Sequence, residues 1–102
     1  MVATAPRIFF SKLFECQCEV LKMAYGNGRA AIQLSDPETS EPICTASVNV
    51  PDIDVPEGHT FIKNYSENEG VLEELIEHCI IEKPIQMISN GFVDIPLCKV
   101  LI

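Results

Sequence analysis

The sequence predicts an α+β domain in which an antiparallel sheet of about five strands carries one amphipathic helix on one face. Three observations predict this: apolar and polar residues alternate in the first half of the chain, one helical periodicity lies near residue 70, and turn-forming residues separate these segments. A sheet with one apolar face needs a second layer, so we expect the helix to cover that face. The expected order is β-β-β-(β)-α-β-β. At 102 residues, the chain (1–102) is expected to form a single domain.

The first strand signal runs from Leu13 to Tyr25. Its apolar positions recur at every second residue, the period of a half-buried strand: Phe14, Cys16, Cys18 and Val20. Residues 26–28 (GNG) then predict a tight hairpin, because Gly and Asn tolerate the positive φ that such turns need. Residues 29–35 alternate again and predict the second strand.

A polar turn at residues 36–42 (DPETSEP) precedes the third predicted strand, residues 43–50. Pro51 ends that strand and opens an irregular acidic loop, and residues 60–63 predict a short strand that leads into the helix.

Beyond the helix, Pro84 prevents further helical continuation. Residues 85–88 are apolar, residues 89–91 (SNG) predict a turn, and residues 92–101 predict the last strand. Pro96 lies within that strand and predicts an edge position or a bulge, because proline has no N–H to donate to a neighbouring strand.

The helix signal extends from Lys63 to Ile81. Ser66 is the expected N-cap, and Glu69 three residues later completes a capping box. The apolar residues at helical spacing are Val71, Leu72, Leu75, Ile76 and Cys79. We expect Leu72, Leu75 and Ile76 to pack on Ile32, Val48 and neighbouring strand residues. Glutamates occupy the opposite side: Glu73, Glu74 and Glu77.

The chain holds five cysteines, an odd number with no CxxC pair: Cys16, Cys18, Cys44, Cys79 and Cys98. The N-terminal MVATAPRIFF has one arginine and no long apolar run, which predicts neither a signal peptide nor a membrane span. We therefore expect a cytoplasmic protein with reduced, mostly buried thiols. Metal sites favour paired Cys or His at short spacing in a loop, so we expect no metal and no cofactor.

Residue pairs that could support catalysis have simpler explanations. His78 and Cys79 are adjacent on the predicted helix, so their side chains diverge, whereas a nucleophile and its base must face a common point. We expect a core thiol beside a solvated imidazole. Glu73 and Glu77 are interpreted as surface charges. The sequence predicts no enzyme, and a small enzyme or metal-binding protein that uses Cys and His is the first alternative.

The net charge of −8 comes from one segment. Residues 52–82 hold nine acids and one base, Lys63, and the other acids and bases balance. Such a surface disfavours free nucleic acid and anionic membranes, and favours a protein partner with a basic surface. The candidate partner-binding residues are Asp52, Asp54, Glu57, Glu67, Glu69, Glu73, Glu74 and Glu77. A plain solvated surface would show the same acidic composition.

Four stretches of the chain, YGNGRAAIQL, SVNVPD, FIKNYSENEGVLEELIEH and GFVDIPLCKVLI, resemble a small bacterial domain family of unknown function. That family is carried largely by mobile genetic elements of gut bacteria and their phages. The resemblance covers roughly residues 18–100, and its most specific part is residues 64–70 (NYSENEG). It implies a small accessory protein of a conjugative element or phage, and no catalytic residue can be carried over.

We therefore predict a non-catalytic, acidic protein-interaction module of a mobile element or phage. Its sharpest form is an inhibitor of a host defence protein, of the anti-CRISPR or anti-restriction type, that binds a basic surface. This step rests on analogy with other small acidic proteins of such elements. A homo-oligomeric accessory or structural protein that uses exposed strand edges is the second alternative.

Overall fold

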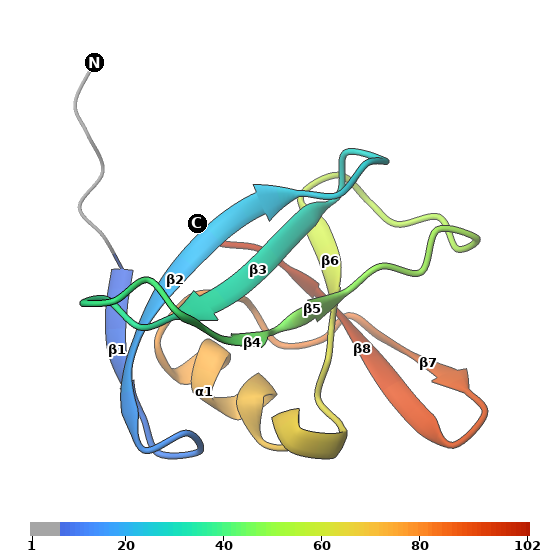
Figure 1. The fold of residues 1–102 in the computed structure, drawn as a ribbon. Coiled ribbons are helices and arrows are strands. Elements are labelled where there is room, and N and C mark those ends of the chain that lie inside the picture. The colour runs from blue at the N-terminus through green and yellow to red at the C-terminus, as the bar shows by residue number, and fades with distance from the viewer. Residues whose placement is uncertain (1–6) are drawn as a thin grey trace.

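The computed structural model describes residues 7–102 and shows an α+β fold with two four-stranded antiparallel sheets and one short α-helix (Figure 1). The α+β class is confirmed, but the prediction of a single sheet of about five strands is wrong. Residues 1–6, on which part of the prediction about the N-terminal stretch rests, lie outside the described residues.

The first sheet has the order β1-β2-β3-β4. Its strands are β1 (Arg7–Ser11), β2 (Cys16–Ala24), β3 (Ala30–Ser35) and β4 (Pro42–Thr45). The predicted hairpin at residues 26–28 is confirmed: the Tyr25 N–H donates to the Arg29 carbonyl at 2.8 Å, and Gly28 has a φ of 86°. β1, which no sequence pattern predicted, pairs with β2 from Arg7↔Val20 to Ser11↔Cys16.

The second sheet has the order β5-β6-β8-β7. Its strands are β5 (Ser47–Val48), β6 (His59–Ile62), β7 (Gln86–Asn90) and β8 (Val93–Lys99). β7 and β8 form a hairpin around Gly91 and Phe92, so the turn lies slightly later than the predicted 89–91. β7 lies at the end of the sheet and pairs with β8 alone among the strands of residues 7–102.

The predicted strand at residues 43–50 is divided between the two sheets at Ala46. The Ala46 N–H donates to the Ile32 carbonyl of β3, and the Ala46 carbonyl accepts from the Lys63 N–H just after β6, both at 2.8 Å. Ala46 is completely buried. A small side chain at this crossing lets one segment contribute to both sheets, which alternation alone could not reveal.

Pro96 lies in β8, which is an inner strand, so the predicted edge position is wrong. Its lack of an N–H is nevertheless accommodated. The Leu97 carbonyl accepts from the Ile85 N–H on the β7 side, so the alternation of the strand directs the nitrogen of Pro96 toward β6. Pairing of β8 with β6 ends at Phe61↔Leu97, so proline lies just beyond the ladder on that side.

The helical segment is shorter than predicted and capped differently. A 3₁₀ turn, η1 (Ser66–Asn68), precedes α1 (Val71–Glu77). Ser66 has a φ of 55° and makes no capping bond, so the predicted capping box is wrong. Instead, Asn64 Oδ1 accepts from the N–H groups of Gly70 (3.1 Å) and Leu72 (3.0 Å), and thus satisfies two donors at the start of α1.

The helix also ends well before Pro84. Cys79 adopts a φ of 60°, and the chain then turns so that Ile80 and Ile81 enter the core. The Ile80 carbonyl accepts from the Leu101 N–H at 2.9 Å, and Ile81 forms a bridge with Val100. Pairing with the C-terminal segment therefore replaces the last predicted helical turn.

The main core lies between α1 and both sheets. Val71 and Leu75 are completely buried, and they share a cluster with Ile32 of β3, Ile62 of β6 and Cys98 of β8. Leu72 and Ile76 pack at its margin. The expected packing of the helix near Ile32 is confirmed.

A second, smaller cluster contains Phe61, Ile95 and Leu97. Three partly buried residues of the loop between β5 and β6 pack on it: Val50, Ile53 and Val55. Val48 also belongs to this cluster, so the expected contact between Val48 and the helix is wrong. The acidic loop therefore packs on this second cluster and shields it from solvent.

Candidate functional site

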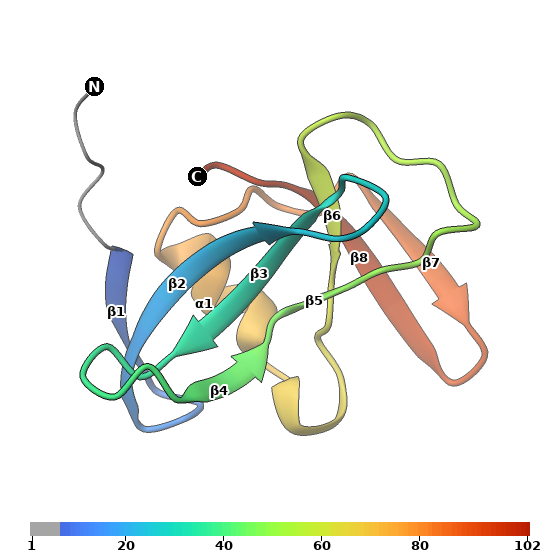
Figure 2. The ribbon, with the colours of Figure 1, turned by 45° about the horizontal axis from the view of Figure 1, so that its top comes forward.

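The structure places the eight candidate acidic residues in two separate groups. The loop group precedes β6: Asp52, Asp54 and Glu57. The helix group follows β6: Glu67, Glu69, Glu73, Glu74 and Glu77. The two groups lie beyond opposite ends of β6, with the loop at one side of the molecule and η1 and α1 at the other (Figures 1 and 2).

The loop group is exposed because its apolar neighbours are held down. Asp52 and Asp54 alternate with Ile53 and Val55, which pack on the second cluster. The guanidinium of Arg29 donates to the carbonyl of Val50 at 2.7 Å and also to that of Ile53. These contacts fix the backbone of the loop and direct its carboxylates into solvent.

Three members of the helix group are exposed and lack an ion pair within residues 7–102: Glu69, Glu73 and Glu77. Glu67 differs because its Oε1 accepts from Lys63 Nζ at 2.8 Å, and this hydrogen bond lowers the pKa of Glu67 and raises the pKa of Lys63. Lys63, the single base of the acidic segment, is therefore already engaged.

The sequence predicts that Glu74 faces away from the core, and the structure shows that this prediction is wrong. Glu74 is half-buried, and its Oε1 accepts from the Leu13 N–H at 2.8 Å, which ties α1 to the turn between β1 and β2. Its Oε2 is buried with no hydrogen-bond partner among the described residues. A sequence signal existed: Glu74 lies three residues after Val71, at the flank of the apolar stripe.

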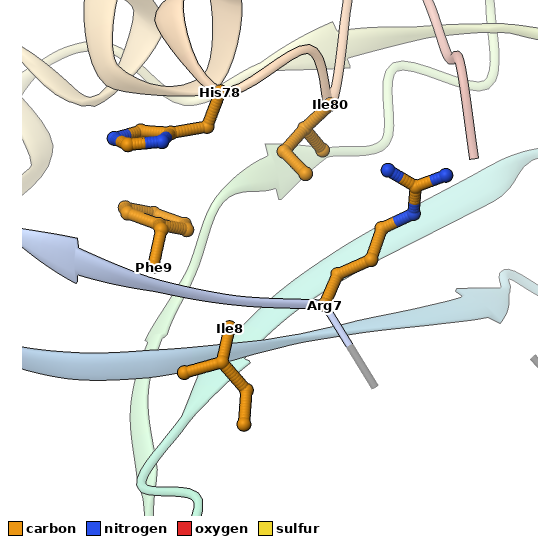
Figure 3. Close-up of a pocket in the computed structure, with 5 residues that line it drawn as sticks. All are labelled: Arg7, Ile8, Phe9, His78 and Ile80. Atoms are coloured by element: carbon orange, nitrogen blue, oxygen red, sulfur yellow. The ribbon is translucent and has the colours of Figure 1, made fainter. Parts of the chain in front are cut away.

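A hollow that the sequence analysis missed lies between β1 and the end of α1 (Figure 3). Its volume is about 230 Å³, and its lining residues are Arg7, Ile8, Phe9, His78 and Ile80. The rings of Phe9 and His78 stack with their centroids 4.6 Å apart, and the guanidinium of Arg7 lies on the Ile80 side (Figure 3). The side chain of Ile8 points away, and half of its surface is exposed.

A second hollow of about 190 Å³ adjoins the first, and His78 lines both. Its other lining residues are Phe10, Lys12, Glu74 and Glu77. β1, the C-terminal half of α1 and the segment that follows it thus form two neighbouring hollows, one of which is lined by two carboxylate residues and by Phe10, which is more than half exposed.

The largest of these hollows, about 470 Å³, lies where the β2–β3 hairpin meets the end of the acidic loop. Its basic groups already have internal partners. Lys22 Nζ donates to the Ile102 carbonyl at 2.8 Å, Arg29 holds the loop, and His59 Nδ1 lies 2.9 Å from the Glu57 carbonyl. A carbonyl only accepts, so Nδ1 of His59 carries the proton. These side chains therefore stabilise the contacts of the β2–β3 hairpin with the C-terminal residue and with the acidic loop.

The cysteines differ in their exposure. Cys18 and Cys98 are buried, Cys16 and Cys44 are half-buried, and Cys79 is exposed, so the expectation of a core thiol at Cys79 is wrong. Burial raises the pKa of Cys18 to about 12 and that of Cys44 and Cys98 to about 11. Nucleophilic attack and metal binding both require the thiolate, which these pKa values disfavour at neutral pH.

Within residues 7–102 no group of three or more His, Cys, Asp or Glu side chains is arranged to hold a metal ion. His78 and Cys79 also do not form a pair, because the imidazole stacks on Phe9 while the thiol lies beyond the helix end. The described part of the chain contains no helix with the length and apolar character needed to cross a membrane.

Comparison of the chain with protein-family models, with curated proteins and with solved structures found no match.

Proposed function

We propose that this protein is a non-catalytic interaction module that binds a basic surface of another protein through α1 and the turn before it. The observation that carries the proposal is the exposure of Glu69, Glu73 and Glu77, none of which forms an ion pair within residues 7–102. Uncompensated carboxylates on one face steer a basic partner toward that face and raise the rate of association.

We base the proposal on three of the eight candidate residues. Glu67 is paired with Lys63, and Glu74 is used to hold the β1–β2 turn. The loop group lies beyond the other end of β6. The helix trio, defined as Glu69, Glu73 and Glu77, is the part of the helix group that can meet a partner without the loss of an internal contact.

The resemblance to a domain family of mobile genetic elements supplies the biological setting of the proposal. In that setting the partner is a host nucleic-acid-binding or defence protein, since such proteins present basic surfaces to bind phosphates. The module would then act as an inhibitor by occupying that basic surface.

The test compares two triple variants with the same change in charge. The first replaces the helix trio (Glu69→Lys, Glu73→Lys, Glu77→Lys), and the second replaces the loop group (Asp52→Lys, Asp54→Lys, Glu57→Lys). Each variant and the unchanged chain are immobilised and used to capture proteins from a bacterial lysate at increasing salt, with circular dichroism as the folding control.

We expect the helix variant to lose a salt-sensitive, basic partner that the loop variant retains. Equal loss of the partner with both variants would mean that binding depends only on net charge. Full retention of the partner by the helix variant would mean that the helix trio is a solvated surface with no role in binding.

A homo-oligomeric role is the second candidate, and β7 favours it. Edge strands usually carry charged residues or proline that prevent pairing with other chains. β7 carries neither, and Ile85 and Met87 are more than half exposed, as is Phe92 at the hairpin tip. Light scattering after size exclusion is the test: a dimer that Met87→Lys converts to a monomer would support this role.

A further inference from the structure

β1 is an edge strand with little protection. It lies at the end of the first sheet and, among strands of residues 7–102, pairs with β2 alone. Its interior residues, Ile8 to Phe10, carry no charge, and the outward side chains of Ile8 and Phe10 are 50% and 54% exposed. An edge of this kind offers backbone groups and apolar contacts to an added strand.

The hollow beside this edge has the chemistry of a site for a long cationic side chain. Phe10, as a lining residue, can pack against the alkyl stem of a lysine or arginine, and the carboxylate of Glu77 can accept from its head group. Glu74 adds a buried carboxylate oxygen with no partner in the described chain. This oxygen is covered by the protein itself, so it makes the hollow more negative without offering a direct contact, and Glu77 is the acceptor for the head group.

Lys12 also lines the hollow, but it forms no ion pair with Glu74 or Glu77 in the described structure. The carboxylate of Glu77 therefore stays open to a cation from outside, while Glu74 keeps its hydrogen bond to the Leu13 N–H.

We propose that an extended, basic segment of the partner adds to the first sheet along β1 and places a lysine or arginine side chain between Phe10, Glu74 and Glu77. This inference rests on the proposed function and specifies the form of the partner: a strand rather than a helix or a folded basic face. Main-chain hydrogen bonds to β1 provide affinity, and the acidic hollow selects the side chain.

The experiment uses the isotopically labelled full chain and a short, capped peptide of alternating valine and lysine as the probe. Titration is followed by amide chemical shifts. We expect the largest changes at Ile8, Phe10 and His78. A matched peptide with glutamine in place of lysine should bind about tenfold more weakly, and one with a central proline should not bind along β1.

A matched pair of protein variants tests the hollow. Glu74→Gln with Glu77→Gln removes both charges but keeps an acceptor for the Leu13 N–H, and it should weaken binding of the lysine peptide about tenfold. Glu38→Gln with Glu41→Gln, in the exposed β3–β4 turn, makes the same change in charge and should alter binding less than twofold.

The outcomes separate the two proposals. If the proline peptide binds as well as the lysine peptide, with shifts at Glu69 and Glu73 instead of β1, strand addition is overturned and the acidic helix surface survives. If no lysine peptide perturbs either β1 or α1, both proposals fail. If the glutamine and lysine peptides bind β1 equally, the edge is a strand-binding site but the cation selection is overturned.

Discussion

The loop between β5 and β6 and the α1 region are both acidic, yet the structure uses their charges differently. In the loop, Arg29 donates hydrogen bonds to the backbone, and the apolar residues pack on the second cluster. The carboxylates that alternate with them therefore point into solvent. In the α1 region, Lys63 and the Leu13 amide each occupy one carboxylate and leave three others free. The count of acidic residues in a segment therefore does not show which of them can meet a partner.

The difference follows from how each region is anchored. α1 is built into the main core through completely buried side chains, so its surface is rigidly placed. The loop contacts only a small cluster through half-buried residues. A surface on rigid secondary structure loses less conformational entropy on binding than one on a loop, which supports α1 over the loop in the interaction that we propose.

The largest predicted effect tests this difference in anchoring. Leu75→Ala removes a completely buried side chain of α1 and should lower the free energy of unfolding by about 2–5 kcal/mol. Ile53→Ala, at a half-buried position of the loop, should cost clearly less. Urea unfolding of both variants measures the two losses, and equal losses would mean that the loop is as deeply integrated as the helix.

The next effect concerns Arg29. Arg29→Met keeps most of the alkyl stem but removes two hydrogen bonds from a charged donor, and we expect a loss of about 1.5–3 kcal/mol. Hydrogen exchange should accelerate at the amides of Ile53 and His59, which close turns in the loop. The amide of His78, which donates to the Glu74 carbonyl at the C-cap of α1, is the internal control, and its acceleration to the same degree would show that the loop does not move independently.

A third comparison lies within the α1 region itself. Asn64→Ala removes the acceptor for the first amides of α1 and should cost about 0.5–2 kcal/mol. Ser66→Ala should change stability by less than about 0.5 kcal/mol, because Ser66 makes no capping bond. Thermal unfolding of the two variants measures both losses. A larger loss of stability for Ser66→Ala than for Asn64→Ala would contradict the assignment of Asn64 as the cap of α1.

The smallest effect concerns the pair formed by Lys63 and Glu67. The hydrogen bond from Lys63 lowers the pKa of Glu67 in the folded state, so the stabilisation is present at neutral pH and is lost as the pH falls through that folded pKa. Carboxylate NMR titration should show a midpoint that rises in Lys63→Met and in concentrated salt. An unchanged midpoint would mean that Lys63 does not lower the pKa of Glu67 and that Glu67 is as free to bind a partner as the helix trio.

Local patterns predicted much of the fold correctly. Alternation placed Cys18 and Val20 in the core, the GNG stretch gave the hairpin, and helical spacing identified Val71 and Leu75 as buried. These predictions succeed because each depends on residues within a few positions of one another, where side-chain direction follows directly from backbone geometry.

The candidate site was predicted only in part. Helical spacing placed Glu73 and Glu77 on the exposed face, as observed. The hollows beside β1 were missed because the stretch Ile8 to Phe10 is a short apolar run without alternation, and the role of Glu74 was missed because its partner, Leu13, is distant in sequence.

The sequence by itself determined the α+β class, most strand phases, the position of the helix and the confinement of the net charge to one segment. Only the tertiary structure decided the division into two sheets, the cap from Asn64, the early end of α1 and the separation of the acidic residues. Each of these depends on a contact between distant segments, such as the Ala46 carbonyl with the Lys63 amide or Ile80 with Leu101. Such contacts compete with local propensity and prevail where they bury more apolar surface or satisfy more backbone groups.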